Sequence, residues 1–287
     1  MEIEKVKIGE NGALLTAYIQ YGSPRIKNAK RRAAVLVLPG GGYEFVSETE
    51  EEPVALEFSA MGFQAFTLSY SVGEKCVFPV PQTEVIAALA FIRENAEKWC
   101  VDGEKIALLG FSAGGHLAAS VGVHWPMLAE RAAIAPEKAR PNALVLVYPC
   151  ITAGEYGYGG IAALHGRGLA EEEKKLLSAE NYVGKHTPPA YLCHTAEDTA
   201  VSCMNTLLFA EALAKNGIPF ETHIFKNGPH GMSLATRATT PELSSLPKEA
   251  EKFFKDQKIL AYLKKARDAF SVWTAESGKF LYDVFSM

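Results

Sequence analysis

The sequence lacks the features that mark several large classes of protein. Its five cysteines are odd in number and scattered along 287 residues, and it has no Cys-x-x-Cys pair and no His-Glu-x-x-His motif. These absences argue against a disulfide framework and the common zinc sites, and we expect neither a metal nor an organic cofactor. No apolar run approaches the roughly 18 residues that a membrane-spanning helix needs.

A strong charge of either sign is also absent. The net charge is only −4, so we expect neither nucleic acid nor an anionic membrane surface as a partner. The basic residues at 27–32 precede an apolar run and are interpreted as solvated loop charges. The first residues alternate apolar and charged side chains without the apolar core of a signal peptide, which favours a cytoplasmic location. Homo-oligomerisation stays open.

The chain alternates strand and helix patterns along most of its length. Two alternating segments at 3–8 and 14–21 flank Asn11-Gly12, a strong hairpin signal. Further strands are expected at 33–38, 63–69, 105–109, 143–148, 190–195 and 220–225, and helices at 50–61, 82–99, 116–123 and 203–216. This order predicts one α/β domain over 1–287, with a doubly wound, mostly parallel sheet and an N-terminal antiparallel hairpin.

Two stretches do not follow this alternation of strands and helices. Residues 150–185 combine a Gly/Tyr-rich stretch with a charged helix pattern at 169–179, and we interpret them as a small insertion over the carboxyl ends of the strands, where ligands bind. The lysine-rich stretch 239–269 is helical in pattern and leads to a final helix around 270–285. Its role is not assigned by the sequence.

The stretch Gly110-Phe111-Ser112-Ala113-Gly114 follows an apolar strand and precedes a small-residue helix pattern. A sharp strand-to-helix turn of this kind exposes a serine hydroxyl, and flanking glycines leave room for it. Because a serine is a weak nucleophile without a base, the pattern needs partners elsewhere in the chain.

Suitable partners follow in the sequence. Asp198 comes after the strand ending at Thr195, and His230 lies in a Gly-Pro loop after the next strand. The order Ser112, Asp198, His230 is that of α/β hydrolases. Taken singly, Asp198 could be a helix N-cap and His230 an exposed loop residue, but their joint placement at strand ends favours a catalytic triad.

The remaining histidines compete less well as the base. His116, one turn past Ser112, is interpreted as a core histidine, whereas His165, in the insertion, could contact a substrate. The others lie within strands or too early in the chain: His124, His186, His194 and His223.

Backbone amides could stabilise an oxyanion beside the serine. One donor is the amide of Ala113 at the start of a helix, and a second is expected from the run Gly40-Gly41-Gly42. The run is not a dinucleotide-binding loop, because Phe45 stands where its third glycine would be, and no phosphate-loop Gly-Lys-Ser/Thr follows.

With these residues in view, the chain resembles the α/β-hydrolase superfamily, and within it bacterial acetyl xylan and feruloyl esterases related to hormone-sensitive lipase. The resemblance runs from about residue 33 to 234 and is carried by the motifs at 38–43, 110–118, 194–198 and 228–231. It implies that Ser112 is the nucleophile, His230 the base and Asp198 its partner. It further implies that the oxyanion donors are the amides of Gly41, Gly42 and Ala113.

The resemblance also implies a substrate, which is a small-molecule or oligosaccharide ester carrying a short acyl group, with acetyl favoured. The expected contacts are Tyr43, Phe111, Tyr156 and Tyr158. Two departures bear on this prediction: Pro39 replaces the histidine usual in the hormone-sensitive lipase group, and the acid loop 198–201 lacks the proline that often follows its valine. A general short-chain carboxylesterase, an arylformamidase or peptidase-like hydrolase, and a non-catalytic binding protein are the alternatives.

Overall fold

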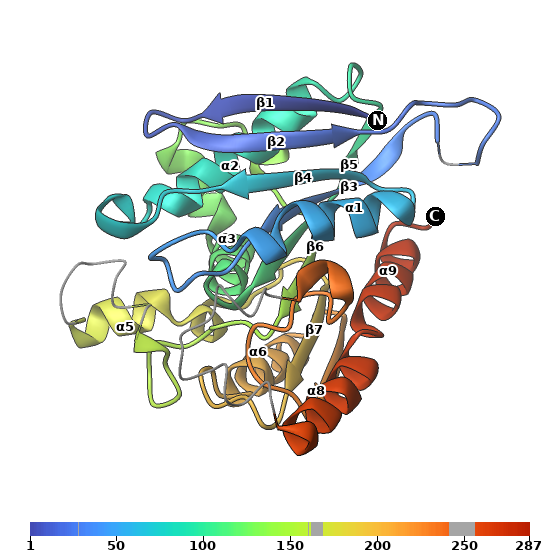
Figure 1. The fold of residues 1–287 in the computed structure, drawn as a ribbon. Coiled ribbons are helices and arrows are strands. Elements are labelled where there is room, and N and C mark those ends of the chain that lie inside the picture. The colour runs from blue at the N-terminus through green and yellow to red at the C-terminus, as the bar shows by residue number, and fades with distance from the viewer. Residues whose placement is uncertain (28, 160, 162–168, 241–255) are drawn as a thin grey trace.

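One twisted sheet runs through the chain in the computed structural model, which describes residues 1–27, 29–159, 161, 169–240 and 256–287 (Figure 1). Within these ranges the sheet has eight strands in the order β1-β2-β4-β3-β5-β6-β7-β8. The strands are β1 (Glu2–Ile8), β2 (Ala13–Ile19), β3 (Arg32–Leu38), β4 (Gln64–Ser69), β5 (Val101–Phe111), β6 (Ala143–Val147), β7 (Ala190–Thr195) and β8 (Phe220–Phe225).

The first two strands form the expected hairpin. They pair antiparallel from Glu2 opposite Ile19 to Ile8 opposite Ala13, and Gly9 and Gly12 take positive φ angles in the turn. Strand β2 also pairs antiparallel with β4, whereas every neighbouring pair from β4 to β8 is parallel. The predicted fold class is therefore confirmed.

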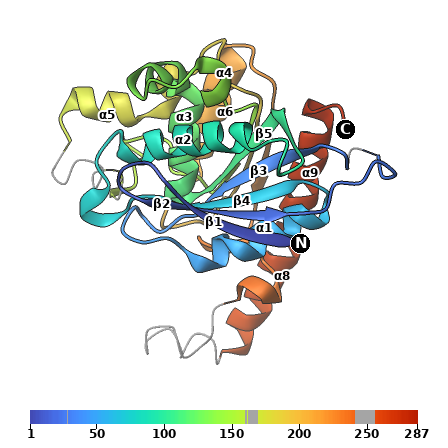
Figure 2. The same ribbon diagram turned by 90° about the horizontal axis from the view of Figure 1, so that it is seen from above.

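Helices cover both faces of the sheet, with α2 and α3 on one face and α1 and α9 on the other (Figure 2). Alternate residues of each inner strand enter two separate cores: Leu36 and Leu108 face one, and Val35 and Leu109 the other. Burial on both faces explains why these strands read as continuous apolar runs. The described α-helices are α1 (Glu52–Ala60), α2 (Val80–Glu94), α3 (Ser112–Arg131), α4 (Pro136–Ala139), α5 (Glu171–Leu177), α6 (Met204–Lys215), α8 (Gln257–Phe270) and α9 (Trp273–Val284).

Short 3-10 helices occupy several of the connections. They are η1 (Glu48–Glu50), η2 (Gly73–Lys75), η4 (Ala179–Tyr182) and η5 (Arg237–Thr239). The first of them, η1, lies between the glycine run that follows β3 and helix α1.

Two helices, α2 and α3, differ most from their expected bounds. Helix α2 begins at Val80, two residues early, because Pro81 suits the first turn, and it ends at Glu94, where the Asn95 side chain bonds the Phe91 carbonyl. Helix α3 begins at Ser112 itself and continues to Arg131, with Pro126 inside it. The serine therefore stands directly at a helix N-terminus.

The carboxyl ends of the parallel strands share one edge of the sheet. The glycine run follows β3, Ser112 follows β5, Asp198 follows β7 and His230 follows β8. Helix α5 and η4 of the predicted insertion lie between β6 and β7 in the chain, and the amide of Ala179 bonds the carbonyl of Ile151 just past β6. This edge is where the candidate site is found.

Candidate active site

Ser112 occupies the tight turn that the sequence predicted. Its φ is +50°, a left-handed value that is uncommon for a residue other than glycine. A Cβ on Gly110 would lie 2.2 Å from the carbonyl oxygen of Gly114, and one on Gly114 would lie 2.1 Å from that of Leu38. Both glycines are therefore required for strand, helix and neighbouring loop to approach this closely.

The structure brings the three separated residues together. Oγ of Ser112 lies 2.8 Å from Nε2 of His230, and Nδ1 of His230 lies 2.6 Å from Oδ2 of Asp198. The Asp198 side chain is fully buried, and that of His230 is 23% exposed. Because Asp198 can only accept at Oδ2, Nδ1 donates to it and Nε2 is free to accept the serine proton.

Asp198 is held as a carboxylate by the loop that follows β7. Its Oδ1 accepts the amides of Ala200 and Val201, both at 2.9 Å, and α6 begins only at Met204, so Asp198 does not cap that helix. Burial alone would raise the pKa of Asp198, but hydrogen bonds from His194 and His230 outweigh it and place the pKa below its ordinary value. The carboxylate is ionised at neutral pH.

The glycine run lies directly beside Ser112. Gly41 and Gly42 have φ angles of +128° and +65°, and a Cβ on Gly41 would lie 2.0 Å from the carbonyl oxygen of Phe45. A Cβ on Gly40 would lie 3.0 Å from that of Ser112. The run thus packs against Ser112, and the amide of Ala113 belongs to the second residue of α3. Donors so placed can stabilise negative charge near Oγ.

The chain is similar to several known proteins. A family model for BD-FAE proteins matches residues 23–145. A crystal structure of an acetyl ester-xyloside bifunctional hydrolase from Caldicellulosiruptor lactoaceticus is 31% identical, with a TM-score of 0.78 over 99% of this chain and 96% of that one. The chain is an α/β hydrolase. Within that family it belongs with carboxylic ester hydrolases.

Two curated relatives match part of this α/β hydrolase. Endo-1,4-beta-xylanase B of Butyrivibrio fibrisolvens is 38% identical over 213 residues, and the acetylxylan esterase of Xylanibacter ruminicola is 28% identical over 214. Each match covers 71% of this chain. The chain spans only 33% and 42% of the length of these two relatives.

A second histidine of the hydrolase contacts the same aspartate. Nε2 of His194 lies 3.2 Å from Oδ2 of Asp198 and 3.0 Å from the Val201 carbonyl, and its Nδ1 lies 2.8 Å from the Thr206 hydroxyl. Since both partners of Nε2 are acceptors, Nε2 carries the proton and Nδ1 accepts from Thr206. From its sequence, His194 is expected only as a strand residue, without a role of its own. The signal that could have found it is its place at the start of the motif at 194–198, four residues before Asp198.

A cleft of about 250 Å³ opens over Ser112 and His230 in the hydrolase. Two aromatic side chains line it, Phe45 and Tyr158. Phe45, which the sequence analysis did not select, is 59% exposed. The hydroxyl of Tyr158 lies 3.1 Å from the position of a Cβ on Gly42. The insertion therefore does reach the cleft, through Tyr158.

Two of the predicted substrate contacts are wrong in the hydrolase. Tyr43 is fully buried, with its hydroxyl 2.7 Å from Nδ1 of His116, because its φ of +66° directs it into the core. Phe111 is also fully buried, and its ring packs against those of Tyr148 and Trp273. Neither side chain presents a surface to a ligand.

The other predicted contacts have different outcomes. Tyr156 is 37% exposed but does not line this cleft, and its carbonyl accepts from the Asn205 side chain. His165 lies outside the described residues, as do 241–255 of the lysine-rich stretch. His116 is a core histidine, as expected: Nε2 donates to the Leu177 carbonyl at 2.7 Å, and burial lowers its pKa to about 4. It fastens α3 to the end of α5.

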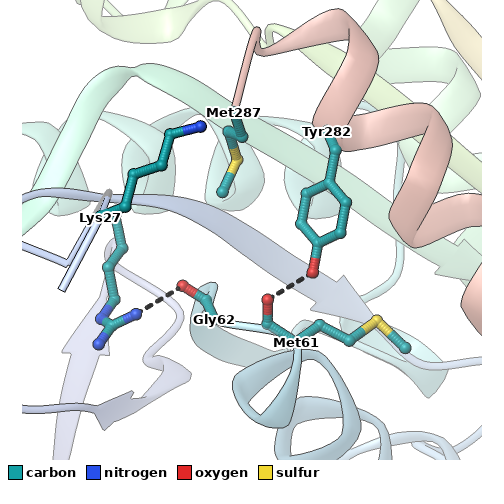
Figure 3. A pocket seen from close by; sticks show the side chains of 6 residues that line it. Lys27, Met61, Gly62, Tyr282 and Met287 are labelled. Carbon is teal, nitrogen blue, oxygen red and sulfur yellow. Dashed lines mark hydrogen bonds between the residues drawn. The ribbon is translucent and has the colours of Figure 1, made fainter.

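A second cavity, of about 280 Å³, lies elsewhere in the hydrolase (Figure 3). It is lined by Lys27, Arg32, Met61, Gly62, Tyr282 and Met287. Arg32 begins β3, whereas Ser112 follows the carboxyl end of the parallel strand β5. This cavity is therefore at the opposite end of the sheet from the triad.

In the part of the chain that the structure describes, no helix has the length and apolar character needed to cross a membrane.

Proposed function

We propose that this hydrolase removes a short acyl group, with acetyl the favoured one, from a sugar or oligosaccharide ester through an acyl-serine intermediate. The observation that carries the proposal is the continuous hydrogen-bonded chain from Ser112 through His230 to Asp198 at the floor of a small cleft. An acetyl ester-xyloside hydrolase and an acetylxylan esterase among its relatives support the substrate class.

In the first half-reaction Ser112 attacks the ester carbonyl while Nε2 of His230 takes its proton. Asp198 orients the imidazole and stabilises its charged form. The amides of Gly41, Gly42 and Ala113 donate hydrogen bonds to the carbonyl oxygen and stabilise the negative charge that develops on it. The positive end of the α3 dipole adds to that stabilisation, because Ser112 and Ala113 begin the helix.

The first half-reaction ends when His230 gives its proton to the departing alcohol, which leaves the acyl group on Ser112. In the second half-reaction a water molecule loses a proton to His230 and attacks the carbonyl of the acyl-serine. His230 then gives that proton to Oγ of Ser112 as the bond to the acyl group breaks, so the carboxylic acid is released and the serine returns to its starting state. No step requires a metal or an organic cofactor.

The cleft suggests how the substrate is recognised. A volume of about 250 Å³ suits a short acyl group with part of a sugar ring. Phe45 offers an exposed ring at the cleft wall, and Tyr158 approaches the glycine run. We also propose that the chain folds as a single domain, because one sheet supplies the loops that carry Ser112, Asp198 and His230. A cytoplasmic location is proposed only from the alternating apolar and charged residues at its start.

The test measures acetate release from acetylated xylo-oligosaccharides and from p-nitrophenyl esters of increasing chain length. We expect Ser112→Ala to lower kcat by roughly five to six orders of magnitude on every substrate, and the wild type to prefer the oligosaccharides over octanoate esters. Full turnover by Ser112→Ala would refute the mechanism. A preference for simple short-chain esters over all sugar esters would indicate a general carboxylesterase.

A further inference from the structure

A buried carboxylate that the proposed mechanism does not use lies beneath the glycine run. Glu50, at the end of η1, is 4% exposed. Its Oε2 accepts the amide of Gly40 at 2.7 Å, and its Oε1 accepts the hydroxyl of Tyr148 at 2.7 Å. A Cβ on Gly40 would lie 2.8 Å from that Oε2 and 3.0 Å from the Cβ of Ser112. The carboxylate and the serine thus flank the same glycine.

The same carboxylate is connected to the histidine loop through Tyr148. The Tyr148 hydroxyl accepts the amide of Ser233 at 2.8 Å, and its ring lies edge-on to His230 with centroids 5.0 Å apart. The hydroxyl of Ser233 donates to the carbonyl of Thr49 at 2.7 Å, next to Glu50. The buried carboxylate of Glu50 therefore connects the glycine run to the loop that carries His230.

Of the groups around Glu50, His230 is the one whose positive charge can offset the negative charge of the carboxylate. Burial raises the pKa of Glu50 above its ordinary value, and the hydrogen bonds from Tyr148 and Gly40 and the nearby His230 offset only part of that rise. Among the described residues no ion pair to Glu50 is formed. Tyr148 and Tyr70 lie close to it, and burial raises both of their pKa values well above 10, so both stay neutral. Glu44, which is exposed, lines the same cleft as Glu50 and His230.

Four groups from different elements surround the imidazole of His230. Asp198 comes from the loop after β7, Tyr148 from the end of β6, Ser112 from the elbow and Glu50 from η1. The carboxylates of Asp198 and Glu50 and the imidazole of His230 therefore lie in one largely buried region, together with the imidazole of His194, which contacts Asp198. A charge that forms on the imidazole during the reaction interacts with both carboxylates.

We infer that Glu50 is a positioning residue that holds the glycine run against Ser112 and, through its negative charge, stabilises the imidazolium of His230 as it forms. The inference rests on the proposed function, since it assigns His230 the role of base. It distinguishes Glu50 from an ordinary structural cross-link, because a cross-link acts through its hydrogen bonds alone.

The decisive variant is Glu50→Gln, which keeps the shape and can still accept the amide of Gly40 but has no charge. We expect kcat to fall about 10-fold with little change in KM. The acid limb of the pH profile of kcat/KM should move to lower pH by about half a unit or more, because an imidazolium without the second carboxylate loses its proton more easily. An unchanged limb with kcat within twofold of wild type would overturn the inference.

Two further variants keep the test decisive if Glu50→Gln folds poorly. Glu48→Gln removes an exposed charge from the same 3-10 helix and should leave kcat and the acid limb unchanged. Tyr148→Phe keeps the carboxyl group but deprives Glu50 of a donor, so Glu50 holds its proton to higher pH. Over that pH range the imidazolium lacks the second carboxylate, and the acid limb should move down, as in Glu50→Gln. A limb that stays fixed or moves up in Tyr148→Phe would count against the role of Glu50.

The outcome also separates this inference from the proposed function. If Ser112→Ala is inactive and Glu50→Gln behaves as wild type, only the role of Glu50 is overturned. If Ser112→Ala remains active, the serine mechanism fails, and the role of Glu50 fails with it because it acts through His230.

Discussion

At the scale of single residues, two aromatic side chains after β3 show how closely neighbouring positions can differ. Tyr43 is fully buried, and Phe45 is 59% exposed at the cleft wall. The amides of Glu44 and Phe45 both bond the carbonyl of Gly41, which sets up the tight turn that separates them. The ring available to a substrate is therefore that of Phe45.

This placement gives a test of substrate contact. We expect Phe45→Ala to raise KM for acetylated oligosaccharides about fivefold through loss of ring contact, with little change for ethyl acetate, which has no sugar. Steady-state kinetics on both substrates would check this. Phe220→Ala, an exposed phenylalanine on β8, serves as the matched control. Equal loss on both substrates would mean that Phe45 supports the loop and does not contact the sugar.

The sequence could predict some residues of the site and not others. Ser112 and His230 lie in short motifs whose glycines and proline dictate the local backbone, and Asp198 follows a well-marked strand. The contact of Glu50 with Tyr148 joins residues 98 positions apart and depends on the path of two loops. Nothing in the local pattern around Glu50 distinguishes it from the exposed acidic residues beside it.

At the scale of elements, helix α8 is tied to the loops that carry the triad. The Tyr262 hydroxyl donates to Oε2 of Glu197 at 2.5 Å and accepts the amide of Gly228 at 3.1 Å. The side chain of Asn227 donates to the other oxygen of Glu197 at 2.9 Å. Glu197 precedes Asp198, and Gly228 lies two residues before His230, so α8 holds the two loops in register.

We therefore expect Tyr262→Phe to lower kcat several-fold without abolishing activity, since the net worth of such hydrogen bonds is about 0.5–1.5 kcal/mol each. Amide hydrogen exchange at 226–231 should become faster, because the Gly228 amide loses its acceptor. Leu260→Ala on the same helix, 37% exposed, is the control. Unaltered exchange in Tyr262→Phe would show that the loops are held by other contacts.

The sequence predicts the bounds of some strands and helices better than those of others. The bounds of β7 and β8 agree with the sequence expectation, because short β-rich apolar runs there are bounded by proline, glycine and polar residues. Helix α3 was underestimated at both ends, since small residues and glycines obscured its first turn and Pro126 its last ones. Tertiary packing against β5 and β6 overrides those weak local preferences.

At the scale of the whole molecule, the carboxylate of Asp198 contributes to the dependence of stability on pH. The pKa of Asp198 in the folded state is below its ordinary value of 3.8, so the unfolded chain takes up the proton first as the pH falls. Its stabilisation is therefore present above about pH 4 and is lost as the pH drops through the folded-state pKa.

Urea unfolding of the wild type and Asp198→Asn at several pH values measures this contribution. The free energy of unfolding of the wild type should exceed that of the variant most between about pH 5 and 7, and the difference should shrink below about pH 4. Glu50 is present in both proteins, so its opposite shift cancels. A difference that grows on acidification would contradict the assignment.

The hydrogen bond between Ser112 and His230 spans 118 positions of the chain, and His230 follows β8, the last strand among the described residues. Under the proposed mechanism, a nascent chain that still lacks β8 and the loop after it contains Ser112 but no base. Hydrolytic activity then depends on the whole sheet, and recovery of turnover after dilution from urea should lag behind the recovery of helical signal.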